Sequence, residues 1–180
     1  MARPERDDAA GIHHVGAHSV WTSVLFRDDL DRVGFVVDLA RVCAKYEWTC
    51  IAFCLMTTHY HLLVETRDES LPLGMQELNF RHAIRFNKRH TLRGHVVDGR
   101  YWNERVESES HLLAAYRYIA RNPVEAGLCT AAIDWPWCSY RALFDPRDIF
   151  TFVDPSAVLA CWAPAETALE QLQRFVESVW

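Results

Sequence analysis

The stretch WTCIAFCLMTTHYHLLVE, residues 48–65, decides the fold of this chain of 180 residues. Its first part, residues 48–56, is rich in aromatic and β-branched side chains, which favour a buried strand. Thr57 and Thr58 form a turn, and residues 59–65 continue as a second strand. Two such runs joined by a short turn are typical of a β-hairpin. The sequence therefore predicts two adjacent antiparallel strands at this point.

A strand and a helix are expected before this hairpin. Residues 12–20 can form a first strand, and apolar residues then recur at the spacing of a helix. Either Asp28 or Asp29 can serve as the N-cap, because a short side-chain oxygen accepts a hydrogen bond from the first helical turn. We expect this helix to end near Tyr46.

After the hairpin, the pattern predicts a helix, a strand and a further helix. These elements cover residues 71–90, residues 101–106 and about residues 111–121. Ser108 or Ser110 can cap the last of these helices. Pro123 should end it, because the residue before a proline avoids helical angles.

The order strand, helix, strand, strand, helix, strand, helix predicts an α+β fold. It is the ferredoxin-like or RRM-like split βαβ layout, an antiparallel sheet with helices on one face. The polar residues 1–11 predict a flexible N-terminus, and residues 12–144 predict one domain. Residues 145–180 predict a C-terminal tail that begins with a linker, DPRD, and contains one helix over residues 165–179. This tail can cover a site, occupy a dimer surface or simply pack.

The composition predicts a soluble, cytoplasmic protein without a membrane partner. Half of the residues are apolar, which is enough for a hydrophobic core. No apolar run approaches the roughly 20 residues of a membrane span, and residues 1–11 lack the apolar core of a signal peptide. The six cysteines contain no CxxC motif, so we expect reduced core residues.

A net charge of −5 counts against nucleic-acid binding, but the basic residues are gathered in one stretch. Residues 81–105 hold seven arginine and lysine side chains and two carboxylates. A phosphate-binding patch and a solvated helix face explain this charge equally well. The candidates for contacts with backbone phosphates are Arg81, Arg85, Lys88, Arg89 and Arg100.

His59 and His61 form the sharpest local motif. Side chains at positions i and i+2 of a strand point to the same face, so both imidazoles can reach one divalent metal. Taken alone, the motif is weak, and two surface histidines on a half-exposed strand are the favoured interpretation.

Tyr118 and Asn122 form the second motif. Positions i and i+4 of a helix share a face, so a phenol and an amide oxygen can address the same point. A tyrosine beside a metal with open coordination positions can attack phosphorus as a covalent nucleophile. Packing and capping roles fit both residues as well. Tyr116 is the rival nucleophile, but the helix turns it about 200° away from the Asn122 face.

Four blocks in this order resemble the REP-associated tyrosine transposases, a branch of the IS200-like single-strand transposases within the HUH endonuclease superfamily. The blocks are FRDDLDR (26–32), WTCIAFCLMTTHYHLLVET (48–66), LGMQELNFRHAIRFNKRH with RGH and DGRYW (73–102), and YRYIARNPVEAGL with DWPWCSYRA (116–142). Together they span most of residues 12 to 143. The chain departs from the family at Thr58, where relatives commonly carry a small or amide residue.

The resemblance implies a metal-dependent endonuclease and strand transferase for single-stranded, hairpin-forming DNA. It implies that His59, His61 and Asn122 bind Mg²⁺ or Mn²⁺, with the two imidazoles favouring Mn²⁺ on ligand type. It implies that Tyr118 forms a 5′-phosphotyrosine with DNA and leaves a free 3′-hydroxyl. Relatives act as monomers or as homodimers.

Two other functions fit parts of the sequence. A non-catalytic nucleic-acid-binding protein with an RRM-like sheet would bind DNA or RNA without cleavage. The full set of His59, His61, Tyr118 and Asn122 argues against this alternative. A metal-dependent hydrolase usually adds an acid two residues after the second histidine, where this chain has Leu63.

Overall fold

The computed structural model describes residues 8–20, 24–145 and 150–178. Within them, the first seven elements are β1 (Gly11–His18), α1 (Asp29–Tyr46), β2 (Thr49–Leu55), β3 (His59–Thr66), α2 (Leu71–His90), β4 (Trp102–Arg105) and α3 (Glu109–Glu125). Shorter elements and the last helix follow: η1 (Ala132–Asp134), α4 (Ser139–Ala142), α5 (Ser156–Leu159), η2 (Ala165–Thr167) and α6 (Ala168–Glu177).

The sheet has the topology that the element order predicts. Its strands are hydrogen-bonded in the order β2-β3-β1-β4, and every described pairing of these strands is antiparallel. In the register, His18 pairs with His59 on one side of β1, and Val15 pairs with Asn103 on the other. The predicted α+β class, hairpin and split βαβ order are confirmed. Because β1 and β3 are the inner strands, residues on them meet at the centre of the sheet.

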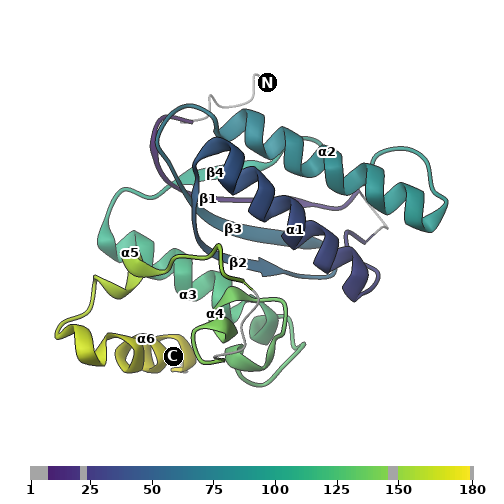
Figure 1. Cartoon of the computed structure of the whole chain (residues 1–180). Coiled ribbons are helices and arrows are strands. Elements are labelled where there is room, and N and C mark those ends of the chain that lie inside the picture. The colour runs from purple at the N-terminus through teal and green to yellow at the C-terminus, as the bar shows by residue number, and fades with distance from the viewer. Residues whose placement is uncertain (1–7, 21–23, 146–149, 179–180) are drawn as a thin grey trace, which may run out of the picture.

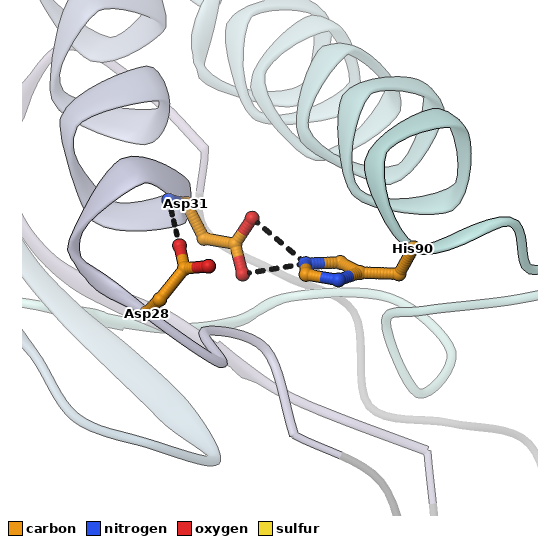
Figure 2. A group of neighbouring side chains, drawn as sticks. All are labelled: Asp28, Asp31 and His90. Carbon is orange, nitrogen blue, oxygen red and sulfur yellow. Dashed lines mark hydrogen bonds and ion pairs between the residues drawn. The ribbon is translucent and has the colours of Figure 1, made fainter.

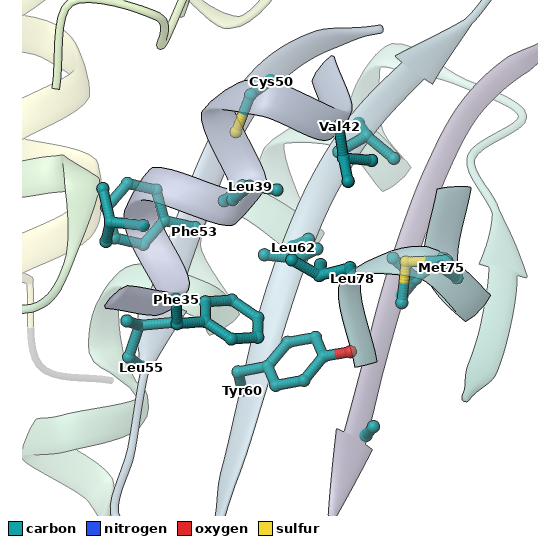
Figure 3. Close-up of a cluster of buried hydrophobic side chains, with 14 of the residues drawn as sticks. Phe35, Leu39, Val42, Cys50, Phe53, Leu55, Tyr60, Leu62, Met75 and Leu78 are labelled. Atoms are coloured by element: carbon teal, nitrogen blue, oxygen red, sulfur yellow. The ribbon is translucent and has the colours of Figure 1, made fainter. Parts of the chain in front are cut away.

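Helices cover both faces of this sheet (Figure 1). Tyr60, Leu62 and Val64 of β3 belong to the core cluster beneath α1 and α2 (Figure 3). Leu63 points to the other face and packs in a second cluster with Ile119 of α3. The expectation of helices on one face is therefore right for α1 and α2 and wrong for α3. Helical periodicity identifies an apolar stripe but not the sheet face that the stripe covers.

The predicted ends of α1 and α3 are confirmed with one exception. Asp28 caps α1 by accepting a hydrogen bond from Asp31 N–H, and Ser108 caps α3 in the same way from His111 N–H. The exception is Pro123, which does not end α3 but lies inside it. Proline removes one hydrogen-bond donor, yet the helix goes on, with Ala126 N–H bonded to the Asn122 carbonyl at 3.0 Å.

The C-terminal segment packs against α3. The predicted single tail helix is α6, and the structure adds the short elements α5 and η2 before it. Val158, Leu172 and Val176 are buried in the same core cluster as Ile119. Arg117 and Arg121 of α3 donate hydrogen bonds to backbone carbonyls at the end of α6. Packing is thus one role of the tail.

Some expectations fall wholly or partly outside the described residues. These are the flexible N-terminus, of which residues 1–7 are not described, and the linker after Asp145, of which residues 146–149 are not described. The division into residues 1–11, 12–144 and 145–180 stays a prediction. All six cysteines are unpaired, and four of them are buried. Among the described helices, none combines the length and the apolar character needed to cross a membrane.

Candidate active site

His59 and His61 lie on the face of β3 that α3 covers. Their ring centroids are 5.0 Å apart, and the rings are nearly perpendicular. His61 is buried, with 4% of its surface exposed, whereas His59 is half-buried. The strand places both imidazoles on one side, as the i, i+2 spacing predicts.

Gly16 makes room for Trp102 beside this pair. It lies on β1 directly opposite His61 and, on the other side, directly opposite Trp102 of β4. A Cβ atom at Gly16 would lie 2.4 Å from the Tyr60 carbonyl oxygen and 2.8 Å from the Trp102 ring. Only glycine therefore lets the Trp102 indole lie over the strand, where its centroid is 5.6 Å from that of His61.

Helix α3 brings Tyr118 and Asn122 to the two histidines. His59 Nε2–H donates a hydrogen bond to Asn122 Oδ1 at 3.1 Å, and the rings of His61 and Tyr118 meet edge to face at 5.3 Å. The side chains predicted from β3 and α3 therefore converge. Tyr118 is 53% exposed, whereas Tyr116 is 1% exposed and packs in the core. Of these two tyrosines, only Tyr118 is accessible to a large substrate.

Burial keeps the histidines of this region neutral. Desolvation, with smaller contributions from the neighbouring histidines, lowers the pKa of His61 to about 3. Desolvation also lowers the pKa of His14, on β1, to about 4, and it lowers that of His59. At neutral pH these rings therefore carry no charge and keep a lone pair, which is the form that binds metal.

We name His14, His59, His61 and Asn122 the histidine cluster. Its atoms suit a divalent ion. His61 Nε2 is buried and has no hydrogen-bond partner among the described residues. His59 Nε2 and Asn122 Oδ1 are 3.1 Å apart, and neighbouring ligands about 2.1 Å from an octahedral ion are about 3 Å apart. Thr58 Oγ1 lies 3.1 Å from His59 Nδ1 and can accept a hydrogen bond from Nδ1–H when Nε2 binds a metal.

A cavity of about 340 Å³ opens beside the cluster. Its walls include Trp102, Tyr118 and the His61 ring. Glu104 and His111 also line it, with His111 Nε2 3.5 Å from Glu104 Oε1. An indole and a phenol offer the flat faces on which an unpaired base can stack.

A second group of ligand-type atoms lies elsewhere, and the sequence pattern did not reveal it. Asp28, Asp31 and His90 place one ligand atom each within 4.8 Å of one another (Figure 2). Arg89 already occupies this group: its guanidinium pairs with Asp31 and with both oxygens of Asp28. Asp31 also accepts hydrogen bonds from His90 and from Arg27 N–H. We name these four side chains, Asp28, Asp31, Arg89 and His90, the acidic cluster.

The predicted DNA-binding residues are not brought to the histidine cluster. Helix α2 covers the opposite face of the sheet, and three of its arginines pair with carboxylates. The pairs are Arg81 with Glu77, Arg85 with Asp38, and Arg89 with Asp28 and Asp31. Lys88 lines a shallow groove on α2, and Arg100 is exposed in the loop before β4. Phosphate binding by these five residues stays a prediction.

Sequence reasoning missed three residues of the site, which are His14, His18 and Trp102. His14 and His18 are four positions apart on β1 and so share the face of His59 and His61. His18 stacks on His59 with centroids 5.0 Å apart. The alternating pattern in GIHHVGAH was the available signal, but only the register with β3 shows what it faces.

Comparisons with known proteins identify the family of the chain and support its fold. A family model described as "Transposase IS200 like" matches residues 12–122. A Haemophilus influenzae protein named as a REP-associated tyrosine transposase is 24% identical over 112 residues. That alignment covers 56% of this chain and 64% of the relative, which is less than two thirds of its length.

A solved structure is also similar, that of a REP-associated tyrosine transposase bound to a REP hairpin. It has a TM-score of 0.68 and covers 87% of this chain and 96% of the solved chain. At 16% identity, this likeness shows a shared fold.

Proposed function

Because the chain belongs to the IS200-like transposase family, we propose that it is a metal-dependent single-stranded DNA endonuclease and strand transferase. The family assignment confirms the resemblance found in the sequence. One observation carries the proposed chemistry: His59 and His61 of β3 converge with Tyr118 and Asn122 of α3. These residues are more than 50 positions apart, and the fold brings an accessible phenol beside three neutral metal-ligand atoms.

Three atoms of the site would hold Mg²⁺ or Mn²⁺: the Nε2 atoms of His59 and His61 and the Oδ1 atom of Asn122. When bound, such an ion polarises a phosphate oxygen and offsets the negative charge that develops there. The imidazole ligands favour Mn²⁺, and Mg²⁺ is the abundant alternative. Their neutral state at pH 7 removes the need to displace protons from charged rings.

Tyr118 is the proposed nucleophile. Its hydroxyl oxygen attacks phosphorus, so that a Tyr118 O–P bond forms while the P–O3′ bond breaks. The phenolic proton passes to solvent, and the departing 3′ oxygen takes up a proton. The products are a 5′-phosphotyrosine and a free 3′-hydroxyl. In strand transfer, a 3′-hydroxyl attacks the same phosphorus, and Tyr118 leaves with a proton.

Hairpin-forming DNA is the proposed substrate. The solved relative is bound to a REP hairpin, and this chain shares its fold. The cavity beside Tyr118 offers the Trp102 face to an unpaired base, which suits a strand presented next to a structured stem. The exposure of Tyr118 allows such a strand to reach the phenol.

A covalent-trapping assay tests the proposal. The protein is mixed with 3′-labelled single-stranded hairpin DNA from repeats near its gene, together with Mn²⁺ or Mg²⁺, and analysed on a denaturing gel. We expect a labelled protein band that requires the metal. The band should disappear in Tyr118→Phe, which removes only the attacking oxygen.

Tyr116→Phe is the matched control, because it makes the same change two residues away, on the buried side of α3. It should leave the band intact. A band that persists in Tyr118→Phe would show that the nucleophile is wrong. Hairpin binding without a covalent band, with either metal, would favour a non-catalytic nucleic-acid-binding protein instead.

A further inference from the structure

His14 is a buried residue that the proposed mechanism does not yet use. It lies on β1 and shares the sheet face of His59 and His61, with 6% of its surface exposed. The Trp102 ring packs against it edge to face at 4.6 Å. A buried imidazole costs free energy unless its polar atoms are hydrogen-bonded. The position therefore needs a polar partner.

That partner is His61. The Nε2 atom of His14 lies 3.2 Å from the Nδ1 atom of His61, and the contact is buried. A neutral imidazole has one N–H and one lone pair. Only one of the two rings can therefore donate the hydrogen bond in this contact. Which ring donates decides whether the other nitrogen of His61, Nε2, carries a proton.

The two arrangements differ in what they leave on His61 Nε2. If His14 donates, His61 must carry its proton on Nε2, a buried atom without a partner among the described residues. If His61 donates through Nδ1, Nε2 keeps a free lone pair beside His59 and Tyr118. Only the second arrangement lets His61 bind a metal as a neutral ligand.

We propose that His14 is a positioning residue whose Nε2 atom accepts a hydrogen bond from His61 Nδ1–H and so holds His61 Nε2 ready to bind the metal. The inference rests on the proposed function, because it assigns His61 to the metal site. His14 does not touch the ion. Its role is to fix the tautomer and the ring orientation of a ligand, as outer partners of metal-bound histidines do.

The first experiment measures the tautomer of His61 in the metal-free protein. Long-range ¹H–¹⁵N spectra of ¹⁵N-histidine-labelled protein at pH 7 report which ring nitrogen carries the proton. We expect His61 to be protonated on Nδ1 in the wild type. The same spectrum of His14→Phe should show Nε2 protonation. Protonation of His61 on Nε2 in the wild type would overturn the proposal.

The second experiment titrates the full chain with Mn²⁺ and follows the free ion by electron paramagnetic resonance. His14→Phe keeps a ring against Trp102 but removes the acceptor, so we expect affinity to fall about 10–100-fold. His14→Gln can return an acceptor oxygen near the position of Nε2 and should recover most of the affinity. Equal affinity in the wild type and His14→Phe would also overturn the proposal.

The variants separate this role from simple packing. If His14→Phe does not fold, the wild-type tautomer and the His14→Gln titration still decide the question. Neither measurement contains DNA, so each reports on His14 whether or not the protein cleaves. Failure of the proposed function would appear differently, as the absence of a Tyr118-dependent covalent band.

Discussion

Two groups of metal-ligand atoms can be compared within this chain. The acidic cluster has two carboxylates and an imidazole within 4.8 Å, yet its charges are already paired by Arg89 and its hydrogen bonds are made (Figure 2). The histidine cluster has no carboxylate among its four members, but His61 Nε2 is buried without a partner among the described residues. The unpartnered nitrogen of His61 distinguishes the histidine cluster from the acidic cluster.

The comparison assigns different roles to the two clusters. The acidic cluster joins the start of α1 to the end of α2, so its interactions contribute to stability. The histidine cluster joins inner strands of the sheet to α3, where an accessible tyrosine lies. Substitutions in one cluster should therefore change stability, and substitutions in the other should change metal binding.

His61→Ala should give the largest effect. It removes a metal ligand, so we expect loss of Mn²⁺ binding beyond the roughly 10–100-fold change of an outer-shell substitution. Titration with Mn²⁺ and the covalent-trapping assay measure this directly. The matched variant is Asp31→Asn in the acidic cluster, which should bind Mn²⁺ like the wild type. If Asp31→Asn loses Mn²⁺ binding and His61→Ala keeps it, the ion binds at the acidic cluster and the assignment to the histidine cluster is wrong.

Asp31→Asn should instead lower stability. Asp31 is 1% exposed, and its carboxylate is bonded to Arg89, His90 and Arg27 N–H. Removing one partner of a buried pair typically costs 3–5 kcal/mol. We expect about 3 kcal/mol, because part of the Arg89 guanidinium reaches water and stays solvated. Urea unfolding measures the change, and an effect below about 1 kcal/mol would contradict the role of the acidic cluster.

The two clusters should lose their contributions to stability in different pH ranges. The folded pKa values of His61 and His14, about 3 and about 4, lie below the ordinary value of 6.5. The folded protein therefore favours their neutral forms. The free energy of unfolding is highest above pH 6.5, and it falls as the pH drops from there toward about 4, because the unfolded chain takes up protons that the folded protein does not. Each shifted histidine costs up to about 1.4 kcal/mol per pH unit in this window.

The carboxylate of Asp28 titrates in a lower window. Its hydrogen bonds from Arg89 and from Asp31 N–H lower its pKa to about 2. Its contribution is present above its ordinary value of 3.8 and is lost between there and about 2. Urea unfolding of metal-free protein at pH 7, 6 and 5 stays above the ordinary pKa values of the carboxylates and measures the histidines with lowered pKa values, which also include His59 and His82. We expect a smaller slope in His14→Phe; an equal slope would show that His14 is not responsible.

The sequence predicted where helices and strands lie better than it predicted what they pack against. The residues 71–90 of α2 and the Tyr118–Asn122 spacing follow from local periodicity, and the structure agrees with both. The face that α3 covers depends on the whole topology, so the local pattern left it open. Pro123 was misjudged because the loss of one hydrogen bond near a helix end does not outweigh the packing of a buried ring.

The partners of the charged side chains could not be predicted from the sequence either. Phosphate binding by Arg85 and Arg89 stays a prediction, but the sequence did not show that the fold pairs them with Asp38 and Asp31, which lie 47 and 58 positions away in the chain. His14 was missed for a related reason. Its role depends on the register of β1 against β3, and a single strand does not contain that information.

Thr58→Ala should give the smallest effect, and it sharpens the comparison within the histidine cluster. Thr58 and His14 each contact the Nδ1 atom of a proposed ligand, at 3.1 Å from His59 and 3.2 Å from His61. The two contacts differ in burial, because Thr58 is exposed and His14 is buried.

Water can replace the exposed Thr58 oxygen as acceptor for His59 Nδ1–H more readily than it can replace His14, whose contact with His61 is buried. We therefore expect Thr58→Ala to weaken Mn²⁺ binding less than about tenfold, below the change caused by His14→Phe. Titrations of both variants under one set of conditions measure the difference. A larger loss in Thr58→Ala would mean that the geometry of His59, not the tautomer of His61, limits metal affinity.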